Sequence, residues 1–239
     1  MRILSRLLVL FITAYLVTTP MELRAEDTQV NEIKTQILLL AQSYSGQGDP
    51  DFSKQYALDT LVNKLLIAVP QPPLQERLPL LYGTWKQVWG PYDYRNKDRG
   101  VDPKLEVNEI YQTVFSGGYY YNVSPLYEDG DRSKIRIGLL RGEYESDETL
   151  PNRINVHFTR YPGIKGRPTH DIPIWRLATL AETNQLSDQI TIVPRWIIWL
   201  FFNTGSLDEV YTDHDLRICY GSDGTESGVR SLYVMTRVE

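Results

Sequence analysis

Three neighbouring residues near the C-terminus, Asp213, His214 and Asp215, carry side chains that could bind a metal ion or transfer a proton. They follow a predicted strand, and successive strand side chains point to opposite faces, so only the two aspartates would converge. A calcium-type loop needs oxygen ligands at several alternate positions and a glycine, and this run lacks that pattern. His157 and His170 are not spaced as metal ligands either. The sequence therefore predicts no metal site.

Candidates for nucleophilic or acid–base catalysis are equally sparse. Cys219 is the only cysteine, so no internal disulfide forms, and no activating histidine or basic motif accompanies it. The chain contains no Gly-x-Ser-x-Gly and no glycine-rich phosphate loop before a helix. Glu143 and Glu145 share a predicted strand face, as the carboxylates of a glycosidase could, but the spacing also suits a solvated rim. We predict no catalytic residue and no cofactor.

A long apolar stretch, Ile192–Phe202, is interrupted only by Pro194 and Arg195. One interpretation is a buried core strand or a packed lid. The other is a wall of an apolar ligand cavity, or an aromatic edge that touches a membrane. Tyrosines of the predicted strand at 119–127 would line the same mouth, because tyrosine has an apolar ring and a polar tip. The candidate ligand-binding residues are Trp196, Trp199, Phe202, Tyr119 and Tyr121.

Two helices are predicted before the strands. Residues 28–44 place apolar side chains at spacings of three and four, which is one apolar stripe. The second helix begins with Asp49 as its cap and Pro50 in its first turn, and continues to Val69. The prolines of residues 70–73 end it in a stiff linker. Two helices alone bury too little surface, so we expect them to pack on a larger body.

From Leu80 onwards the apolar period changes to two, which is typical of strands. Leu81, Gly83, Trp85, Gln87 and Trp89 would share one face. Further alternating runs follow at residues 109–115, 119–127, 135–140, 154–159, 207–212, 216–220 and 232–238, with a short helix over 173–183. Successive short strands separated by turns predict a mainly β fold, an antiparallel barrel preceded by the N-terminal helix pair.

The first 25 residues have the layout of a secretory signal peptide. Arg2 and Arg6 precede an apolar run, Leu7–Val17, and Ala25 supplies a small residue for cleavage. The run is shorter than the ~20 residues that span a bilayer, although a retained anchor is the alternative. We therefore predict a leader over 1–25, a helical segment over 26–73, a barrel domain over 74–239, and a secreted or periplasmic location.

Composition excludes several classes of protein. The chain has 239 residues, of which 42% are hydrophobic and 23% charged, which suits one domain with a packed core. These values exclude collagen-like, disulfide-framework and intrinsically disordered chains. The formal charge is −5 and the basic residues form no local cluster, so we predict no nucleic-acid partner.

Two segments resemble a known family. Residues 80–86 read LLYGTWK and residues 205–218 read GSLDEVYTDHDLRI. The first is similar to the L-x-G-x-W-x-L-x-Y strand of the plastid lipid-associated proteins, or plastid fibrillins, and the second resembles their C-terminal G-x-L-x-x-x-Y-L-D-x-D-L-R-I. The helix pair also fits that family's layout. The resemblance implies a lipocalin-like barrel. For a photosynthetic source, the thylakoid lumen is the alternative to the secreted or periplasmic location.

The residues of these motifs predict a structural closure of the barrel. Trp85 is a large plug, and Gly83 beside it allows the backbone to approach closely. An arginine over the indole face would add a cation–π contact, with Arg217 as first candidate and Arg237 as second. A partly buried guanidinium needs a carboxylate, and we expect that to be Asp213 or Asp215. The predicted closure residues are Gly83, Trp85, Asp213, Asp215 and Arg217.

We predict that the chain is not an enzyme and binds a hydrophobic small molecule, a lipid or an isoprenoid, in the barrel. Its partners would be that ligand or membrane lipid, with peripheral membrane contact. The first alternative is a structural or interaction module whose barrel is filled by its own side chains. The second is an enzyme of unassigned chemistry, in which Asp213, His214 or Glu143 would converge in a cleft.

Overall fold

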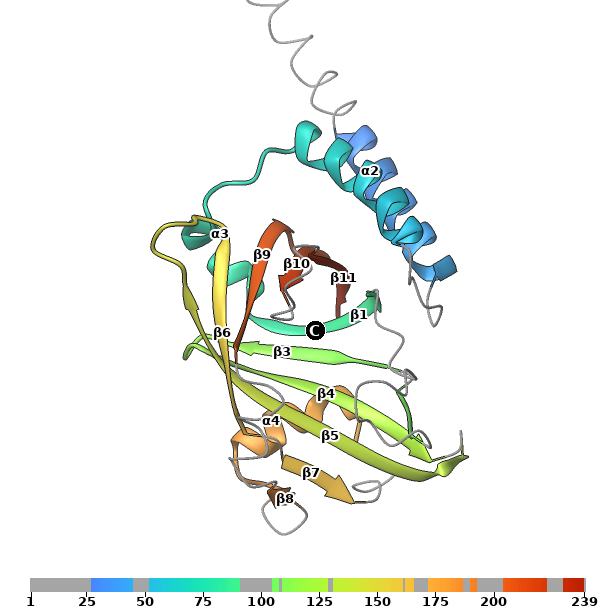
Figure 1. Ribbon diagram of the computed structural model, residues 1–239, viewed down its shortest axis with the longest axis vertical. Helices are drawn as coiled ribbons and strands as arrows, with labels where there is room; N and C mark the ends of the chain where they lie inside the picture. The colour runs from blue at the N-terminus through green and yellow to red at the C-terminus, as the bar shows by residue number, and fades with distance from the viewer. Residues whose placement is uncertain are drawn as a thin grey trace, which may run out of the picture.

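A computed structural model shows a β-barrel with helices packed on its outside (Figure 1). It describes residues 27–44, 52–90, 105–107, 109–128, 131–160, 162–165, 172–186, 190–192, 204–222 and 230–238. The predicted leader, Asp49, Pro50 and His170 lie outside these residues. The helical parts are residues 27–44, α2 (Ser53–Ala68), α3 (Leu74–Leu81), the 3-10 turn η2 (Ile174–Arg176) and α4 (Leu177–Glu182).

The strands pair in the order β2-β4-β3-β1-β11-β10-β9-β6-β5-β7-β8, and β4 also pairs with β5. That last pairing closes an antiparallel barrel of eight strands, β4, β3, β1, β11, β10, β9, β6 and β5. The mainly β barrel and the helices before it are thereby confirmed. The strand bounds are β1 (Gly83–Trp89), β2 (Leu105–Val107), β3 (Tyr111–Phe115), β4 (Tyr119–Glu128), β5 (Asp131–Ser146), β6 (Arg153–Arg160), β7 (Pro162–Lys165), β8 (Ile190–Ile192), β9 (Thr204–Thr212), β10 (Leu216–Ser222) and β11 (Ser231–Arg237).

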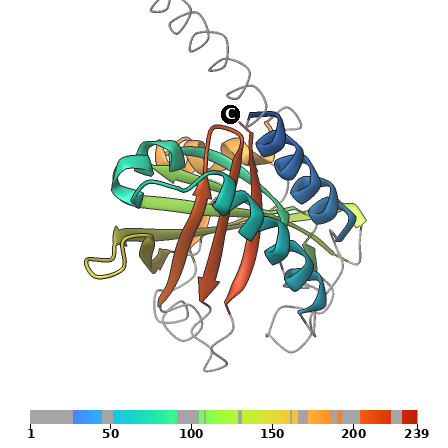
Figure 2. The same ribbon diagram turned by 90° about the horizontal axis from the view of Figure 1, so that it is seen from above.

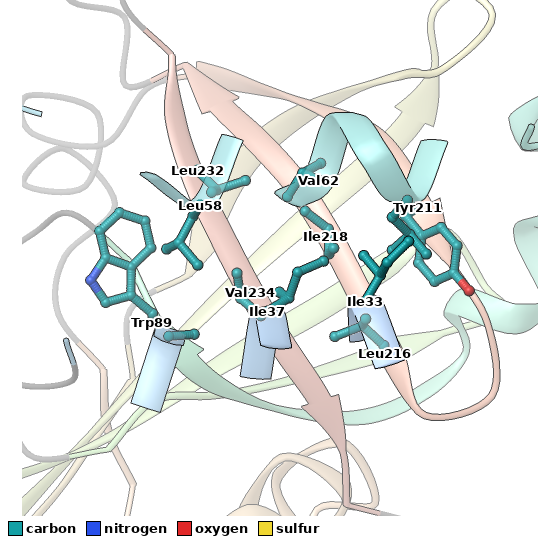
Figure 3. Close-up of a cluster of buried hydrophobic side chains, with 12 residues drawn as sticks. Ile33, Ile37, Leu58, Val62, Trp89, Tyr211, Leu216, Ile218, Leu232 and Val234 are labelled. Carbon is teal, nitrogen blue, oxygen red and sulfur yellow. The ribbon is translucent and has the colours of Figure 1, made fainter. Parts of the chain in front are cut away.

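The helix pair formed by residues 27–44 and α2 covers the outer face of β9, β10 and β11 (Figure 2). Ile33, Ile37, Leu58 and Val62 from the helices pack against apolar side chains of the strands, as Figure 3 shows. The strand residues in this cluster are Trp89, Tyr211, Leu216, Ile218, Leu232 and Val234. The apolar stripe predicted for the first helix therefore packs on the outer face of the barrel.

Polar contacts fasten the helix pair to the strands. Lys34 Nζ lies 2.6 Å from a carboxylate oxygen of Asp213, and the Tyr220 hydroxyl donates to Asp59 of α2 over 2.6 Å. The buried side chain of Gln55 donates to the carbonyl of Arg230 and accepts from the backbone N–H of Leu232. These contacts fix the helices along one line of the barrel wall.

Replacing Asp213 by Asn is expected to reduce the loss of stability in acid. Burial raises the pKa of the Asp213 carboxyl, but hydrogen bonds from Lys34, Tyr211 and two backbone N–H groups lower it, so the net pKa lies below its ordinary 3.8. A carboxyl with a depressed folded pKa contributes stability above its unfolded pKa and loses that contribution as the pH falls through the folded pKa. Between about pH 5 and about pH 2.5 the natural chain should therefore lose more free energy of unfolding than Asp213→Asn. Urea titrations at both pH values measure this, and equal losses would contradict it.

A short helix, α3, follows the predicted linker of residues 70–73 and includes the start of the predicted first strand. Leu74, Arg77 and Leu81 are buried, and the chain leaves the helix through Gly83, whose φ of 120° is open to glycine. The predicted strand from Leu80 therefore begins only at Gly83. Eight residues with a single buried stripe are too short for the periodicity to decide between helix and strand.

On the opposite side of the barrel, α4 and η2 cover the outer face of β4 and β5. Leu177 and Ala178 pack on Val123, Ile137 and Leu139. The short helix predicted over residues 173–183 is thus confirmed, and it explains why alternate residues of both strands are apolar on their outward side.

Candidate functional site

The barrel lumen is the candidate site, and α3 lies at one end of it. At this end most of the inward side chains are buried, with Trp85 and Arg217 among the largest of them, and Tyr144 of β5 is partly buried. Cys219 of β10 and Met235 of β11 fill the space beside them. Tyr120 of β4 also points inward, over Gly142 of β5, where an added Cβ would lie 2.6 Å from its ring. The half of the lumen next to α3 is therefore occupied by the protein's own side chains.

The guanidinium of Arg237 lies over the indole ring of Trp85. The guanidinium carbon of Arg237 is 4.1 Å from the centre of the indole ring, and Trp85 Nε1 donates to the carbonyl of Leu81 over 2.8 Å. Arg237 donates to the carbonyls of Tyr82 and Leu80 over 2.8 Å and 2.5 Å. Burial lowers the pKa of Arg237. The first candidate for this position, Arg217, was wrong and the second was right, because β11 and not β10 is the neighbour of β1.

Arg217 pairs with Glu209 of β9 and not with Asp213 or Asp215. Its Nε and a terminal nitrogen donate to the two carboxylate oxygens of Glu209 over 3.0 Å and 2.5 Å. The side chains are 1% and 0% exposed. Burial lowers the pKa of Arg217, but the Glu209 carboxylate raises it by more, so the net pKa lies above its ordinary value. Glu209 was not among the predicted closure residues, although its position two residues after Leu207 places it on the same strand face.

Arg77 of α3 brings a second guanidinium to the same end of the lumen. It is 2% exposed and donates to the Thr212 hydroxyl, the Asn152 side chain and the backbone carbonyl of Glu209. Burial lowers its pKa. These bonds hold α3 against the ends of β9 and β6.

Asp213, His214 and Asp215 form the turn between β9 and β10. One oxygen of Asp213 accepts the backbone N–H groups of Asp215 and Leu216, both at 2.8 Å, and the other accepts from Lys34 and from Tyr211. The backbone carbonyls of His214 and Asp215 accept hydrogen bonds from Arg237. Asp213 therefore shapes the turn and docks a helix. Within the described part of the chain, no three His, Cys, Asp or Glu side chains group as metal ligands.

Tyr119 and Tyr121 point away from the lumen, which corrects the prediction that they line its mouth. Tyr119 stacks on Phe115 with ring centres 4.9 Å apart, and the Arg141 guanidinium lies 4.8 Å from its ring. The Tyr121 hydroxyl donates to Glu182 of α4 over 2.8 Å. Strand alternation puts the residue between them, Tyr120, inside. The other predicted ligand residues, Trp196, Trp199 and Phe202, lie outside the described residues.

The half of the lumen away from α3 differs in burial and in chemistry. Its inward side chains are only partly buried. They are Gln87, Gln112, Asn122, Leu140, Phe158, Leu207 and Tyr233. The amides come from the neighbouring strands β1, β3 and β4, and the apolar and aromatic side chains come from β5, β6, β9 and β11. This half therefore has one amide side and one apolar side.

Cys219, Glu143 and Glu145 lie where a structural role, and not a catalytic one, would place them. Cys219 is buried, and burial raises the pKa of its thiol, which is unsuited to a nucleophile. Glu143 and Glu145 lie exposed on the outer face of β5, beside Arg141 and His157. A shallow depression lies on the exposed side of helix 27–44, and its lining residues are of polar types. Its lining residues are Thr28, Asn31, Glu32, Thr35 and Gln36.

A comparison with protein-family models gives no match, and a comparison with curated proteins gives none either. The resemblance to the plastid lipid-associated proteins therefore stays a prediction that the two motifs carry. None of the helices in the described segments is long and apolar enough to cross a bilayer.

Proposed function

We propose that the barrel binds an apolar small molecule, a lipid or an isoprenoid, without catalysis, in the half of the lumen that faces away from α3. A closed β-barrel is compatible with ligand binding. The observation that carries the proposal is the contrast between the two halves. Trp85, Glu209 and Arg217 are buried at the α3 end, whereas Leu140 and Tyr233 stay partly exposed although they face inward.

Apolar contact would supply most of the binding energy. The wall of Leu140, Phe158, Leu207 and Tyr233 would gain about 25 cal/mol for each Å² of apolar surface that a ligand removes from water. The amide side, Gln87, Gln112 and Asn122, would hold the polar end of the ligand. A ligand of this kind enters from the end away from α3, because Arg77 and the side chains around Trp85 occupy the other end.

We propose binding without catalysis because two titratable groups of the described part of the lumen, Glu209 and Cys219, are paired or unreactive. Glu209 is bound through both oxygens by Arg217, and the thiol of Cys219 has a raised pKa. Neither group is available as a base or a nucleophile near neutral pH.

A structural or interaction module is the second candidate, and the packed α3 end of the lumen favours it. If side chains fill the whole barrel, no ligand enters and the outer helices become the surface that matters. The uptake experiment below separates the two.

The cellular setting is part of the proposal. The leader predicted for residues 1–25 supports export to a secreted or periplasmic location, and membrane lipid is then the nearest source of ligand. The motifs at residues 80–86 and 205–218 support a relationship to the plastid lipid-associated proteins.

Purified full-length chain is expected to carry lipid that organic solvent extracts, and to take up the apolar fluorophore N-phenyl-1-naphthylamine. Leu140→Asp, which places a charge on the apolar wall, should weaken uptake about tenfold or more, because burying a charge beside an apolar ligand is costly. Leu39→Asp is the matched control, since Leu39 is 62% exposed on the outer helix. Fluorescence titration measures both variants, and circular dichroism checks their folding. A chain that carries no lipid and takes up no fluorophore would support the filled barrel.

A further inference from the structure

The polar groups of the lumen form one chain of hydrogen bonds that starts at Glu209. Glu209 binds Arg217, Arg217 donates to the side-chain oxygen of Gln112, and Gln112 Nε2 donates to Asn122 Oδ1 over 2.9 Å. The chain crosses the lumen from β9 and β10 to β3 and β4, and leads from the fully buried end to the partly exposed half.

The donors and acceptors of Arg217, Gln112 and Asn122 fix the direction of this series of hydrogen bonds. A guanidinium has donors and no acceptor, so Gln112 must turn its oxygen toward Arg217. The amide nitrogen of Gln112 then faces Asn122, and Asn122 must present its own oxygen to it. Each amide has one oxygen and one NH₂ group, so the chain ends with the NH₂ group of Asn122. Among the residues that the structure describes, Asn122 Nδ2 has no hydrogen-bond acceptor, and the side chain is partly exposed.

The charged side chains at the α3 end of the lumen also favour a ligand group that accepts hydrogen bonds. Three guanidiniums, those of Arg77, Arg217 and Arg237, lie at the α3 end, and Glu209 is the carboxylate that lies inside the lumen with them. The carboxylates of Asp213 and Asp215 approach Arg237 from the turn outside, and Asp213 is itself bound by Lys34. The field inside the lumen is therefore positive, and a donor chain polarised by a cation attracts an acceptor more strongly than a neutral amide does.

We infer that the lumen selects ligands whose polar end is a carboxylate, so that the cargo class is the long-chain carboxylic acids, with a carboxylate oxygen accepting from Nδ2 of Asn122. This inference rests on the proposed function. A hydroxyl can also accept from Asn122 but brings no charge, and an ammonium has only donors, which would meet the donor end of the chain.

Competition against N-phenyl-1-naphthylamine tests the inference with palmitic acid, 1-hexadecanol and hexadecylamine, which share a chain length and differ at the polar end. At about pH 8 the acid is ionised, and we expect it to bind about tenfold more tightly than the alcohol, with the amine weakest. Equal affinities for the three compounds, or tightest binding of the amine, would overturn the inference and leave the proposed function standing. Failure of all three and of the fluorophore would overturn both.

Substitution of Asn122 gives a second, internal measurement. Asn122→Asp keeps the oxygen that Gln112 needs and replaces the NH₂ donor by an acceptor, so the preference for palmitic acid over hexadecylamine should reverse. Asn122→Leu removes the donor without adding charge, and should bring palmitic acid and 1-hexadecanol to similar affinity. Asn63→Asp, on the exposed side of α2, is the matched control and should keep the natural order. An unchanged order in both Asn122 variants would contradict the role of this residue.

Discussion

Replacing Glu209 by Gln is expected to lower the free energy of unfolding by about 3–5 kcal/mol, because it leaves the guanidinium of Arg217 buried without its counter-charge. The two side chains are 0% and 1% exposed, and both carboxylate oxygens of Glu209 accept from Arg217. Urea unfolding followed by tryptophan fluorescence measures the difference. The neutral amide keeps the shape of the side chain, so the change isolates charge and hydrogen bonding.

Two further variants make this prediction specific. Glu143→Gln removes the carboxylate of an exposed ion pair with Arg141, in which Glu143 is 57% exposed, and should cost no more than about 1 kcal/mol. Combining Glu209→Gln with Arg217→Met should restore part of the stability lost by the single change, because the buried charge is gone as well. If Glu209→Gln unfolds at the urea concentration of the natural chain, the pair does not stabilise the barrel as we infer.

Trp85→Ala is expected to destabilise the barrel by about 3–5 kcal/mol, the cost typical of emptying a large aromatic site in a core. The indole is fully buried, donates to the Leu81 carbonyl over 2.8 Å, and carries the guanidinium of Arg237 on its face. Removing it leaves a cavity between β1 and β11 and takes away the surface on which Arg237 rests. Thermal and urea unfolding measure the loss.

Trp175 provides the comparison for this prediction. It lies partly buried on η2 outside the barrel, so Trp175→Ala should cost less than half as much. A double-mutant cycle between Trp85→Leu and Arg237→Met should give a coupling free energy of about 0.5–2 kcal/mol for the cation–π contact, because leucine has no aromatic ring. A cycle without coupling would show that the two side chains are neighbours only.

The two halves of the lumen connect stability with the proposed function. Side chains from α3, β1, β9, β10 and β11 fill one half and hold its shape through Arg77, Arg217 and Arg237. This packed half positions the amides of Gln112 and Asn122 so that they face the other half of the lumen. A variant that destabilises the packed half is therefore expected to weaken ligand binding too, so the binding experiments above use substitutions in the partly exposed half.

Local patterns in the sequence determined most of the elements. Apolar spacings of three and four predicted the helix pair, and the period of two predicted the runs that became β3, β4, β6, β9, β10 and β11. These patterns record which face of an element is apolar, and the residues of that element alone carry them. The absence of helices between most strands indicated an antiparallel barrel, and the 8-stranded ring confirms it.

The composition of the lumen was decided by the tertiary structure. In β9 the pairing with β10 skips Val210, so Tyr211 faces the helices and Glu209 faces inward, although regular alternation would put both on one side. A bulge of one residue leaves no mark in the period. The order of strands around the ring likewise placed Arg237 over Trp85 and left Arg217 to Glu209. Which side chains meet across a barrel depends on closure and register between distant segments, and spacing along the chain does not encode either.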